Sequence, residues 1–526
     1  MNRTGDARAK SNLERPSAFR LEPETLNSYP ARTLSVLHRI FQTKSLDQLV
    51  AETEEPQHQL KRVLGPINLI ALGIGAIIGA GIFALVGTAA AGHPAEAGQA
   101  ARLGAGPALT LAILLTAVGC TFCALCYAEF ASMVPVAGSA YTYSYATLGE
   151  IVAWMIGWDL VLEYAVGNIA VAVSWSGYFV ELLHGFGIDF PKWLATDIRA
   201  ALQTPEIVNA APRVFGVPIL FNLPAVFIVS ALTVLLVIGI KESARFNIVM
   251  VGLKLLVLAF FVIVGIQYIK PGNWHPFMPN GWKGVQAGAA VMFFAYIGFD
   301  AVSTTAEETR NPKKNMPIGI IGSLIICAII YIIVTAVLTG MKHWSQLNTA
   351  EPLSVAFREV NIPWAAAIVA FGSVVAHTAV LLVFQLGQPR ILFAMGRDGL
   401  LGKWSQKVHP RFRTPHVATI VTGVFVAVGS AIASLEETSD MTSIGTLSAF
   451  ILVCAGVWIL RRRDPSRPRG FRTPWVPLVP LLGIGSCLYL MLGLPTIAWI
   501  RLAVWMVVGL ILYFTYGYKH SRLRAR

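Results

Sequence analysis

The amino-acid sequence predicts an all-α integral membrane protein. Of its 526 residues, 55% are hydrophobic and only 13% are charged, and the mean hydropathy is +0.63, whereas about a quarter of the residues of a typical soluble domain are charged. After a polar stretch of about sixty residues the chain contains long apolar runs, each near the roughly 20 residues that a helix needs to cross a bilayer. A membrane barrel would instead show alternating segments of about ten residues. The sequence therefore predicts a bundle of membrane-spanning helices.

Twelve such runs follow one another along the chain, separated mostly by short polar loops. We expect transmembrane helices at approximately residues 66–90, 106–131, 149–183, 223–240, 244–268, 284–306, 317–340, 362–395, 416–434, 442–461, 475–492 and 499–517. The corresponding domain organisation is an N-terminal tail over residues 1–60, a membrane domain over 61–520 and a C-terminal tail over 521–526.

The distribution of charge predicts the orientation of the chain. The formal net charge is +13, but residues 1–60 contain eight Lys/Arg and eight Asp/Glu, so the excess lies in the loops between the spans. Loops that carry an excess of Lys and Arg face the cytoplasm. With twelve spans, both termini are then cytoplasmic in a multi-pass protein of the cell inner membrane. The positive charge indicates topology and contact with anionic lipid, not nucleic-acid binding. The densest cluster comprises Arg461, Arg462, Arg463, Arg467, Arg469 and Arg472.

Three cysteines form a C-x-x-C-x-x-C row that resembles a metal-binding pattern. Cys120, Cys123 and Cys126 all lie within the second predicted span, and the sequence supplies no fourth ligand nearby. We interpret them as small apolar side chains in a membrane helix, and we expect neither a metal nor a cofactor.

The stretch G-I-G-A-I-I-G-A-G-I-F, Gly73 to Phe83, places four glycines in the first span. A glycine within a helix costs about 1 kcal/mol relative to alanine. Gly75 and Gly79 form a G-x-x-x-G pair that could allow close packing of another helix. Alternatively, the glycines could interrupt the helix and expose backbone groups at membrane depth. The first span alone leaves both interpretations open.

A second unusual span favours the interrupted helix. Span six reads V-M-F-F-A-Y-I-G-F-D-A-V-S-T-T-A-E-E-T, Val291 to Thr309, with Gly298 among aromatic residues and Asp300 at membrane depth. Spans one and six are five helices apart, as in an inverted repeat of five spans. Interrupted helices at corresponding positions of two repeats indicate the binding site of a secondary transporter.

Three motifs together resemble the amino acid-polyamine-organocation transporter superfamily. They are the stretch Gly73–Phe83, the sequence F-F-A-Y-I-G-F-D-A-V-S-T-T-A-E-E-T-R-N-P in span six, and G-Q-P-R-I-L-F-A-M-G-R-D-G-L-L from Gly387 to Leu401. The flanks F-Q-T-K-S-L-D-Q-L (Phe41–Leu49) and F-R-T-P-W-V-P-L-V-P (Phe471–Pro480) resemble the cationic amino acid transporter branch in its bacterial form. The resemblance implies the LeuT-type fold, in which spans one to five and six to ten are inverted repeats and two helices are additional.

The resemblance also implies how an amino acid would bind. A zwitterion can leave water only if fixed dipoles meet both of its charges, and the start of a half-helix offers free amides and a positive dipole end. Carried over by motif, the carboxylate-binding amides are those of Gly79, Ala80 and Gly81, and the ammonium-binding carbonyls are those of Ile77, Phe294, Ala295 and Ile297. Phe294 is also the candidate aromatic gate, the alternative being an aromatic side chain that only packs within the bundle or against lipid.

Lys254 is the clearest ionisable residue at membrane depth, midway along span five. Such residues are costly to insert and are functional candidates by default. Burial disfavours the charged ammonium, so the amine could bind and release a proton during transport. In related proton-coupled permeases a lysine of span five occupies the place where sodium-driven relatives bind a cation. The alternative is a structural lysine that snorkels or forms an ion pair.

Three further residues are candidates for specificity or gating. Glu163 lies four residues after Asp159 on one face of span three, and it could face the cavity or bond to a neighbouring helix. His377, in span eight, stands where the family often has a small residue that faces the substrate, so its bulk argues against arginine as the substrate. Asp300 is expected to be a structural or gating partner.

The sequence as a whole predicts a proton-coupled amino acid uptake permease that works by alternating access. The alternatives are an uncoupled amino acid exchanger or facilitator, and an amino acid sensor on the same scaffold. We find no H-E-x-x-H motif and no G-x-S-x-G motif in a span, so an enzyme is not expected, and no nucleotide-binding loop is present. The expected partners are the amino acid, protons and membrane lipid; an accessory membrane peptide or a homo-oligomer is left open.

Overall fold

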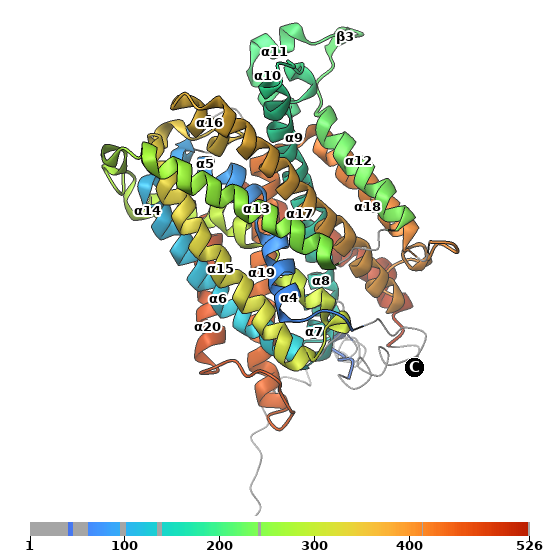
Figure 1. Cartoon of the computed structure of the whole chain (residues 1–526). Coiled ribbons are helices and arrows are strands. Elements are labelled where there is room, and N and C mark those ends of the chain that lie inside the picture. The colour runs from blue at the N-terminus through green and yellow to red at the C-terminus, as the bar shows by residue number, and fades with distance from the viewer. Residues whose placement is uncertain are drawn as a thin grey trace, which may run out of the picture.

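The computed structural model describes residues 40–45, 62–94, 101–133, 139–239, 244–412 and 414–523. The described chain is mostly helical (Figure 1). Most of the predicted N-terminal tail, and the end of the C-terminal tail, lie outside the described residues.

Eight helical segments of the described chain are long and apolar enough to cross a membrane. This confirms an all-α integral membrane protein. The segments are α6 (Leu109–Met133) with a 3₁₀ turn, η2 (Gly106–Ala108), before it; α8 (Glu150–Val161), η3 (Leu162–Val166) and α9 (Gly167–Gly185) in one run; α13 (Ala244–Gly265) with η5 (Ile266–Tyr268); α14 (Gly281–Met292) with η7 (Phe293–Tyr296) and η8 (Asp300–Glu308); α15 (Pro312–Met341); α17 (Pro363–Arg397); α19 (Leu435–Arg463); and α21 (Thr496–Leu512) with η11 (Tyr513–Gly517) and α22 (Tyr518–His520).

A ninth membrane segment is a bent pair, and three apolar helices are shorter. The pair consists of α4 (Pro66–Ile77) and the run of η1 (Gly81–Leu85) and α5 (Val86–Ala91), which are inclined by 46° to each other. The shorter helices are α12 (Leu223–Ile238), α18 (His416–Ile432) and α20 (Leu478–Met491). Each coincides with a predicted span.

Small elements connect these helices. They are the hairpins β1 (Gly92–His93) with β2 (Arg102–Leu103) and β3 (Arg213–Val214) with β4 (Val217–Pro218), both antiparallel, and the short helices α7 (Ser139–Thr147), η4 (Lys192–Leu194), α10 (Ile198–Gln203), α11 (Pro205–Ala210), η6 (Pro271–Trp274), η9 (Trp344–Gln346), α16 (Pro352–Glu359) and η10 (Lys403–Gln406). Asp197 begins α10 by accepting a hydrogen bond from the Ala200 amide, which satisfies one of the free donors of a helix start.

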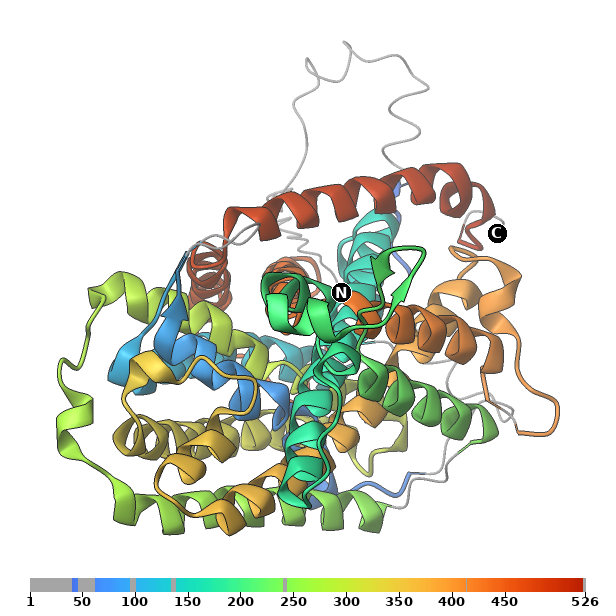
Figure 2. The same cartoon turned by 90° about the horizontal axis from the view of Figure 1, so that it is seen from above.

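The membrane helices form two groups that pack against each other. In the first group α15 contacts α4 and α6, and α14 contacts α6. In the second group α17 contacts the α8–α9 run, and α12 and α18 pair at its outer side (Figures 1 and 2). Two helices, α13 and α19, contact members of both groups. Figure 2 shows α21 lying along one edge of the bundle, where few of its side chains are buried. The two interrupted helices both belong to the first group.

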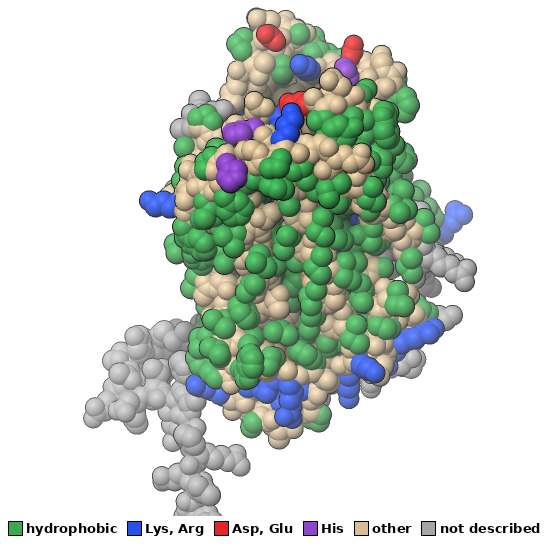
Figure 3. Space-filling view, turned by 60° about the vertical axis from the view of Figure 1, so that its left-hand side comes forward, with side chains coloured by type: hydrophobic (Ala, Val, Ile, Leu, Met, Phe, Trp, Pro, Cys, Tyr) green, Lys and Arg blue, Asp and Glu red, His purple; other side chains and the backbone are tan. Residues whose placement is uncertain are grey.

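The surface shows the pattern that a bilayer imposes. Figure 3 shows a wide band of hydrophobic side chains across the face in view, with Lys and Arg side chains along its lower rim. This rim carries the loop between α19 and α20, and we call it the basic end. The opposite end carries α10, α11 and the β3–β4 hairpin.

The cysteine row does not stay isolated when the chain folds. Cys123 of α6 lies 3.4 Å, sulfur to sulfur, from Cys487 of α20 and 3.9 Å from Cys454 of α19. Both partners come from helices more than 300 positions further along the chain. All six cysteines are free thiols in buried positions, and no group of His, Cys, Asp or Glu within the described ranges is arranged to hold a metal ion.

Candidate functional site

The first interruption lies in the glycine-rich stretch of the first membrane segment. Helix α4 ends at Ile77, Ile78 is extended (φ −77°, ψ 105°), and the second half of the segment begins at Gly81 as a short π-helical turn. Residues Ile77 to Gly81 are buried. The first amides of a helix and the last carbonyls of the one before it lack partners within their own helices. Polar backbone groups are therefore concentrated at this point in the apolar interior.

The second interruption lies between α14 and η8. The chain passes through the 3₁₀ turn η7, Ile297 turns it out of the helix (ψ 137°), and Gly298 has φ +117°, a conformation that side chains rarely allow. A Cβ atom at Gly298 would lie 2.9 Å from the backbone of Ala76, and one at Gly81 would lie 2.3 Å from the Cα of Ala295. The two interruptions are therefore in direct contact, and both glycines are required by that contact.

Tyr331 of α15 joins the two interruptions. Its hydroxyl oxygen lies 3.0 Å from the carbonyl oxygen of Ile77 and 3.0 Å from that of Ala295. A hydroxyl has one proton, so Tyr331 can donate fully to only one of these carbonyls at a time. Sequence reasoning missed this residue, although a tyrosine within an apolar span is a polar group that needs a partner at membrane depth.

Lys254 lies beside the first interruption. Its fully buried ammonium donates hydrogen bonds to the carbonyl oxygens of Gly75 at 2.8 Å and of Ile78 at 3.0 Å. Both carbonyls are at the C-terminal end of α4, where the helix dipole favours a cation. The alternative that Lys254 snorkels to the membrane surface does not fit this geometry, because the side chain is directed into the protein.

His377 packs against the second half of the first segment rather than standing free. Its Nδ1 lies 2.7 Å from the carbonyl oxygen of Ser373, which can only accept, so Nδ1 carries a proton. Its Nε2 lies 2.7 Å from the hydroxyl of Ser174. The ring also lies against Phe83 and Tyr178, with ring centres 5.8 and 5.7 Å away. Phe294, the candidate gate, is buried in η7.

Glu163 and Asp300 face each other between the two helix groups. Both side chains are fully buried and close enough to interact electrostatically. Glu163 Oε2 and both carboxyl oxygens of Asp300 find no hydrogen-bond partner among the described residues. Asp159 instead accepts a hydrogen bond from the Ser448 hydroxyl at 2.6 Å. Asp159 belongs to α8 and Glu163 to the π-helical turn η3, and the two carboxyl groups have different neighbours, Ser448 and Asp300.

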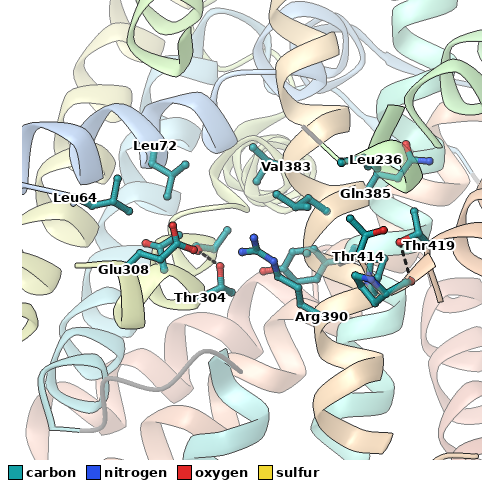
Figure 4. A pocket seen from close by; sticks show the side chains of 18 of the residues that line it. Leu64, Leu72, Leu236, Thr304, Glu308, Val383, Gln385, Arg390, Thr414 and Thr419 are labelled. Carbon is teal, nitrogen blue, oxygen red and sulfur yellow. Dashed lines mark hydrogen bonds between the residues drawn. The ribbon is translucent and has the colours of Figure 1, made fainter. Parts of the chain in front are cut away.

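A cavity of about 450 Å³ opens between the two helix groups near the basic end. Figure 4 shows Glu308 and Thr304 of η8 on one side and Arg390 of α17 on the other, with the Glu308 carboxylate and the Arg390 guanidinium directed toward each other. Among the described residues no ion pair forms between them. The wall consists of residues from α4, η3, η8, α12, α17 and α18 and the stretches flanking them: Val63, Leu64, Asn68, Leu72, Tyr164, Leu236, Gly239, Ala301, Thr304, Thr305, Glu308, Val383, Gln385, Leu386, Gly387, Pro389, Arg390, Thr414, Pro415 and Thr419.

The predicted binding residues do not line this cavity. Ile77, Gly79, Ala80, Gly81, Phe294, Ala295 and Ile297 are packed together beyond its inner end. Leu72 lines the cavity five residues before Ile77, which is about 7.5 Å along a helix. A Cβ at Gly79 would lie 2.9 Å from Val380, and Val383 lines the cavity less than one turn further along α17. The cavity therefore ends close to the two interruptions.

Backbone hydrogen bonds join the two interrupted segments at the basic end. The Leu64 amide donates to the Glu308 carbonyl at 3.0 Å, and the Arg310 amide donates to the Leu64 carbonyl at 2.9 Å. These bonds hold the residues just before α4 against the residues at the end of η8, so the two interrupted segments form one continuous part of the cavity wall.

At the opposite end, ion pairs hold the first segment against α19. Arg102 contacts Glu436 at 3.1 Å and Asp440 at 2.6 Å, and His93 contacts Glu436 at 2.8 Å. The other ring nitrogen of His93 lies 2.9 Å from the Pro94 carbonyl, so both nitrogens face acceptors and the imidazolium is favoured. The hydrogen bond to Glu436 accordingly raises the pKa of His93. Sequence reasoning missed this cluster, whose basic and acidic residues are more than 300 positions apart in the chain.

The helical membrane fold, with two interrupted helices in contact and a cavity that ends close to them, is typical of a multi-pass membrane transporter. The sequence comparisons specify its family: residues 64–515 match the amino acid permease family, and the chain belongs to that family. Its function is amino acid uptake across the membrane, and it is not an enzyme.

Three relatives illustrate the similarity. The chain is 47% identical over 486 residues to the branched-chain amino acid permease BcaP of Bacillus subtilis, covering 92% of this chain and 99% of that one. It is 43% identical over 484 residues to the methylthioribose transporter of the same bacterium, with the same coverage. It is 36% identical over 438 residues to the vacuolar cationic amino acid transporter 4 of Arabidopsis thaliana, covering 82% of this chain and 68% of that protein. The resemblance to this superfamily and to its cationic amino acid transporter branch is confirmed.

Proposed function

We propose that the protein takes up amino acids together with protons by alternating access in a LeuT-type fold of twelve spans. The eight long segments, the bent pair and the three shorter apolar helices would be the twelve spans. In this topology residues 61–520 form the transporter domain, and both tails are cytoplasmic in the cell inner membrane. The basic end would then face the cytoplasm, as an excess of Lys and Arg favours.

The contact between the two interruptions carries the proposal for substrate binding. Tyr331 lies within 3.0 Å of the carbonyls of Ile77 and Ala295, two of the groups expected to receive an amino acid's ammonium. That ammonium would take over these acceptors, with the carbonyls of Phe294 and Ile297 beside them. The amides of Gly79, Ala80 and Gly81 would bind the carboxylate, since they begin the second half-helix. Phe294 would close over the bound substrate.

The position of Lys254 supports coupling to protons. The charged ammonium holds Gly75 and Ile78 at the end of α4 through charge-assisted hydrogen bonds, which are stronger than those of a neutral amine. Loss of the proton from Lys254 would weaken both hydrogen bonds, so the backbone at the first interruption would be less firmly fixed. Protonation would thereby select a conformation, which is the requirement for coupling a proton gradient to transport.

We propose neutral, aliphatic amino acids as the preferred substrates. His377 and its partners Ser174 and Ser373 fill the space beside Phe83, which leaves less room for a long basic side chain. The name of the Bacillus relative with 47% identity, a branched-chain amino acid permease, points the same way. The buried carboxyl groups of Glu163 and Asp300 would serve gating rather than recognition of a basic substrate.

The ion pairs at the two ends support alternating access. The contacts of His93 and Arg102 with Glu436 and Asp440 would be the external gate, which is closed in this structure. Glu308 and Arg390 would form the internal gate, which is open because no ion pair joins them. The structure would then represent the state that faces the cytoplasm.

A thermal-shift screen of the purified protein tests the substrate class, because a ligand that binds the folded state raises the melting temperature. The panel comprises the twenty amino acids, common polyamines and methylthioribose. We expect leucine, isoleucine and valine to stabilise the protein. Stabilisation only by arginine, lysine and ornithine would contradict the assignment based on His377, and stabilisation only by methylthioribose would contradict an amino acid substrate.

A further inference from the structure

A second open groove, of about 640 Å³, lies at the basic end on the outside of the bundle. One wall is the start of α15, and the other is the loop that leads from α19 to α20, two segments that Figure 1 places at the same end of the molecule. The lining residues are Lys313, Lys314, Pro317, Ile318, Ile321, Gly322, Gly470 and Phe471. The groove is separate from the cavity between the helix groups, with which it shares no residue.

The wall formed by α15 is charged at one end and apolar further along the helix. Its lining positions recur at intervals of four along the helix, so they lie on one face. The two lysines stand at the rim, and Pro317, Ile318 and Ile321 follow inward. From Lys313 to Ile321 the helix rises about 12 Å, which carries the groove from the charged rim into the hydrophobic band seen in Figure 3. A ligand that fits has a charged head and an apolar tail.

The charge of the groove indicates an anionic head. Lys313 and Lys314 are exposed, and within the described ranges neither side chain has a salt bridge or hydrogen bond. The end of α19 and the facing loop, residues 461–472, contain six arginines and one carboxylate, Asp464. Arg461 and Arg469 already bind Glu129 at 2.7 and 2.9 Å. Positive charge therefore remains in excess around the groove.

The two walls are held at a fixed separation by a glycine contact. A Cβ atom at Gly470 would lie 2.5 Å from the Cβ of Lys313 and 2.7 Å from its carbonyl oxygen, so only glycine fits there. This contact seats Phe471 opposite the apolar face of α15. The groove is thus a defined feature of the fold and does not depend on a flexible side chain.

We propose that this groove binds one anionic glycerophospholipid of the membrane, with its phosphate between Lys313 and Lys314 and an acyl chain along Pro317, Ile318 and Phe471. Each basic residue near a membrane surface adds attraction for anionic lipid, and the apolar face adds burial that a soluble phosphate cannot provide. The bound lipid would connect α15, which follows the second interrupted segment directly, to the loop before α20. This inference does not depend on the proposed substrate or on proton coupling.

Native mass spectrometry of the detergent-purified full chain tests the proposal, with phosphatidylglycerol and phosphatidylcholine added at equal concentration. We expect the wild-type protein to retain one phosphatidylglycerol at concentrations where phosphatidylcholine is lost. The Lys313→Gln/Lys314→Gln variant should bind phosphatidylglycerol roughly 30-fold more weakly. The matched control is Lys403→Gln/Lys407→Gln, which removes two exposed lysines outside the groove and should bind like wild type.

Three outcomes would overturn the proposal. The first is equal retention of the two lipids by the wild-type protein. The second is unchanged phosphatidylglycerol binding by the Lys313→Gln/Lys314→Gln variant. The third is an equal loss of phosphatidylglycerol binding by the Lys403→Gln/Lys407→Gln control, which would indicate an effect of surface charge alone. A second variant, Ile318→Gln, keeps both lysines and makes the apolar wall polar, so it should weaken the binding of long-chain phosphatidylglycerol. Soluble glycerol phosphate should not compete; effective competition would show that a phosphate site without an acyl-chain site is present.

Discussion

Replacing Lys254 by methionine should uncouple transport from the proton gradient. Methionine has a similar length and no charge, so it fills the space of the lysine but cannot donate to Gly75 and Ile78. Leaving two buried carbonyls unpaired costs about 1–3 kcal/mol each. Part of this free-energy cost is offset because the variant, unlike the wild-type protein, does not have to bury a charged amine. A net cost of even 2 kcal/mol changes the population of the affected conformation roughly 30-fold.

The assay is uptake of labelled leucine into proteoliposomes with an alkaline interior. A pH difference of one unit stores about 1.4 kcal/mol per proton, enough for about tenfold accumulation at one proton per substrate. We expect accumulation by the wild-type protein and by Lys283→Met, which replaces an exposed lysine of α14. The Lys254→Met variant should only equilibrate leucine or exchange it. Accumulation at the wild-type level by Lys254→Met would refute the role given to this lysine.

Three further changes test other parts of the site. Tyr331→Phe removes the hydroxyl that occupies the two carbonyls expected to receive the substrate's ammonium, so it should lower the KM for leucine roughly five- to tenfold. Gly298→Ala should lower the melting temperature and uptake, since its φ of +117° and its contact with Ala76 exclude a side chain, whereas Gly485→Ala, with open space around it, should not. In His93→Gln the melting temperature should fall below that of the wild type at pH 6, and the difference should vanish at high pH.

The direction of the pH dependence follows from the hydrogen bond between His93 and Glu436, which raises the pKa of His93 in the folded protein. The stability gained is fully present below about pH 6.5, the usual histidine value. It is lost as the pH rises through the higher pKa of the folded state. A constant difference between the wild type and His93→Gln across pH 6–9 would show that the contact does not depend on the charge of the imidazole.

Outcomes that contradict the other two predictions are also measurable. An unchanged KM in Tyr331→Phe would mean that the carbonyls of Ile77 and Ala295 do not take part in substrate binding. Equal melting temperatures for Gly298→Ala and Gly485→Ala would mean that the second interruption can relax, and the close contact between the two interrupted segments would not be required.

The interrupted helices were predictable from sequence because glycine at a fixed spacing within apolar runs is a local pattern. All twelve apolar runs coincide with helices, although α12, α18 and α20 are shorter than the roughly 20 residues expected of a span. The place of Lys254 was also predictable, since an isolated charge at membrane depth requires a partner. Its contacts with Gly75 and Ile78 were not, because the unwound geometry of α4 determines them.

Features that depend on distant parts of the chain escaped prediction. Tyr331 contacts residues 254 and 36 positions away, and Arg102 pairs with Asp440. The prediction that Asp159 and Glu163 share a face assumed a regular helix, whereas Glu163 lies in the π-helical turn η3, and the two carboxyl groups have different neighbours, Ser448 and Asp300. Such turns often occur at functional sites and have no simple sequence pattern.

The most direct test of proton-coupled uptake is the proton flux driven by the substrate itself. Proteoliposomes containing the wild-type protein and an entrapped pH-sensitive dye are prepared with equal pH inside and outside. On addition of leucine outside, the account predicts that the interior becomes acidic as protons enter with the amino acid, and that Lys254→Met shows no such change. Entry of labelled leucine without acidification by the wild-type protein would contradict proton coupling and favour a facilitator or exchanger.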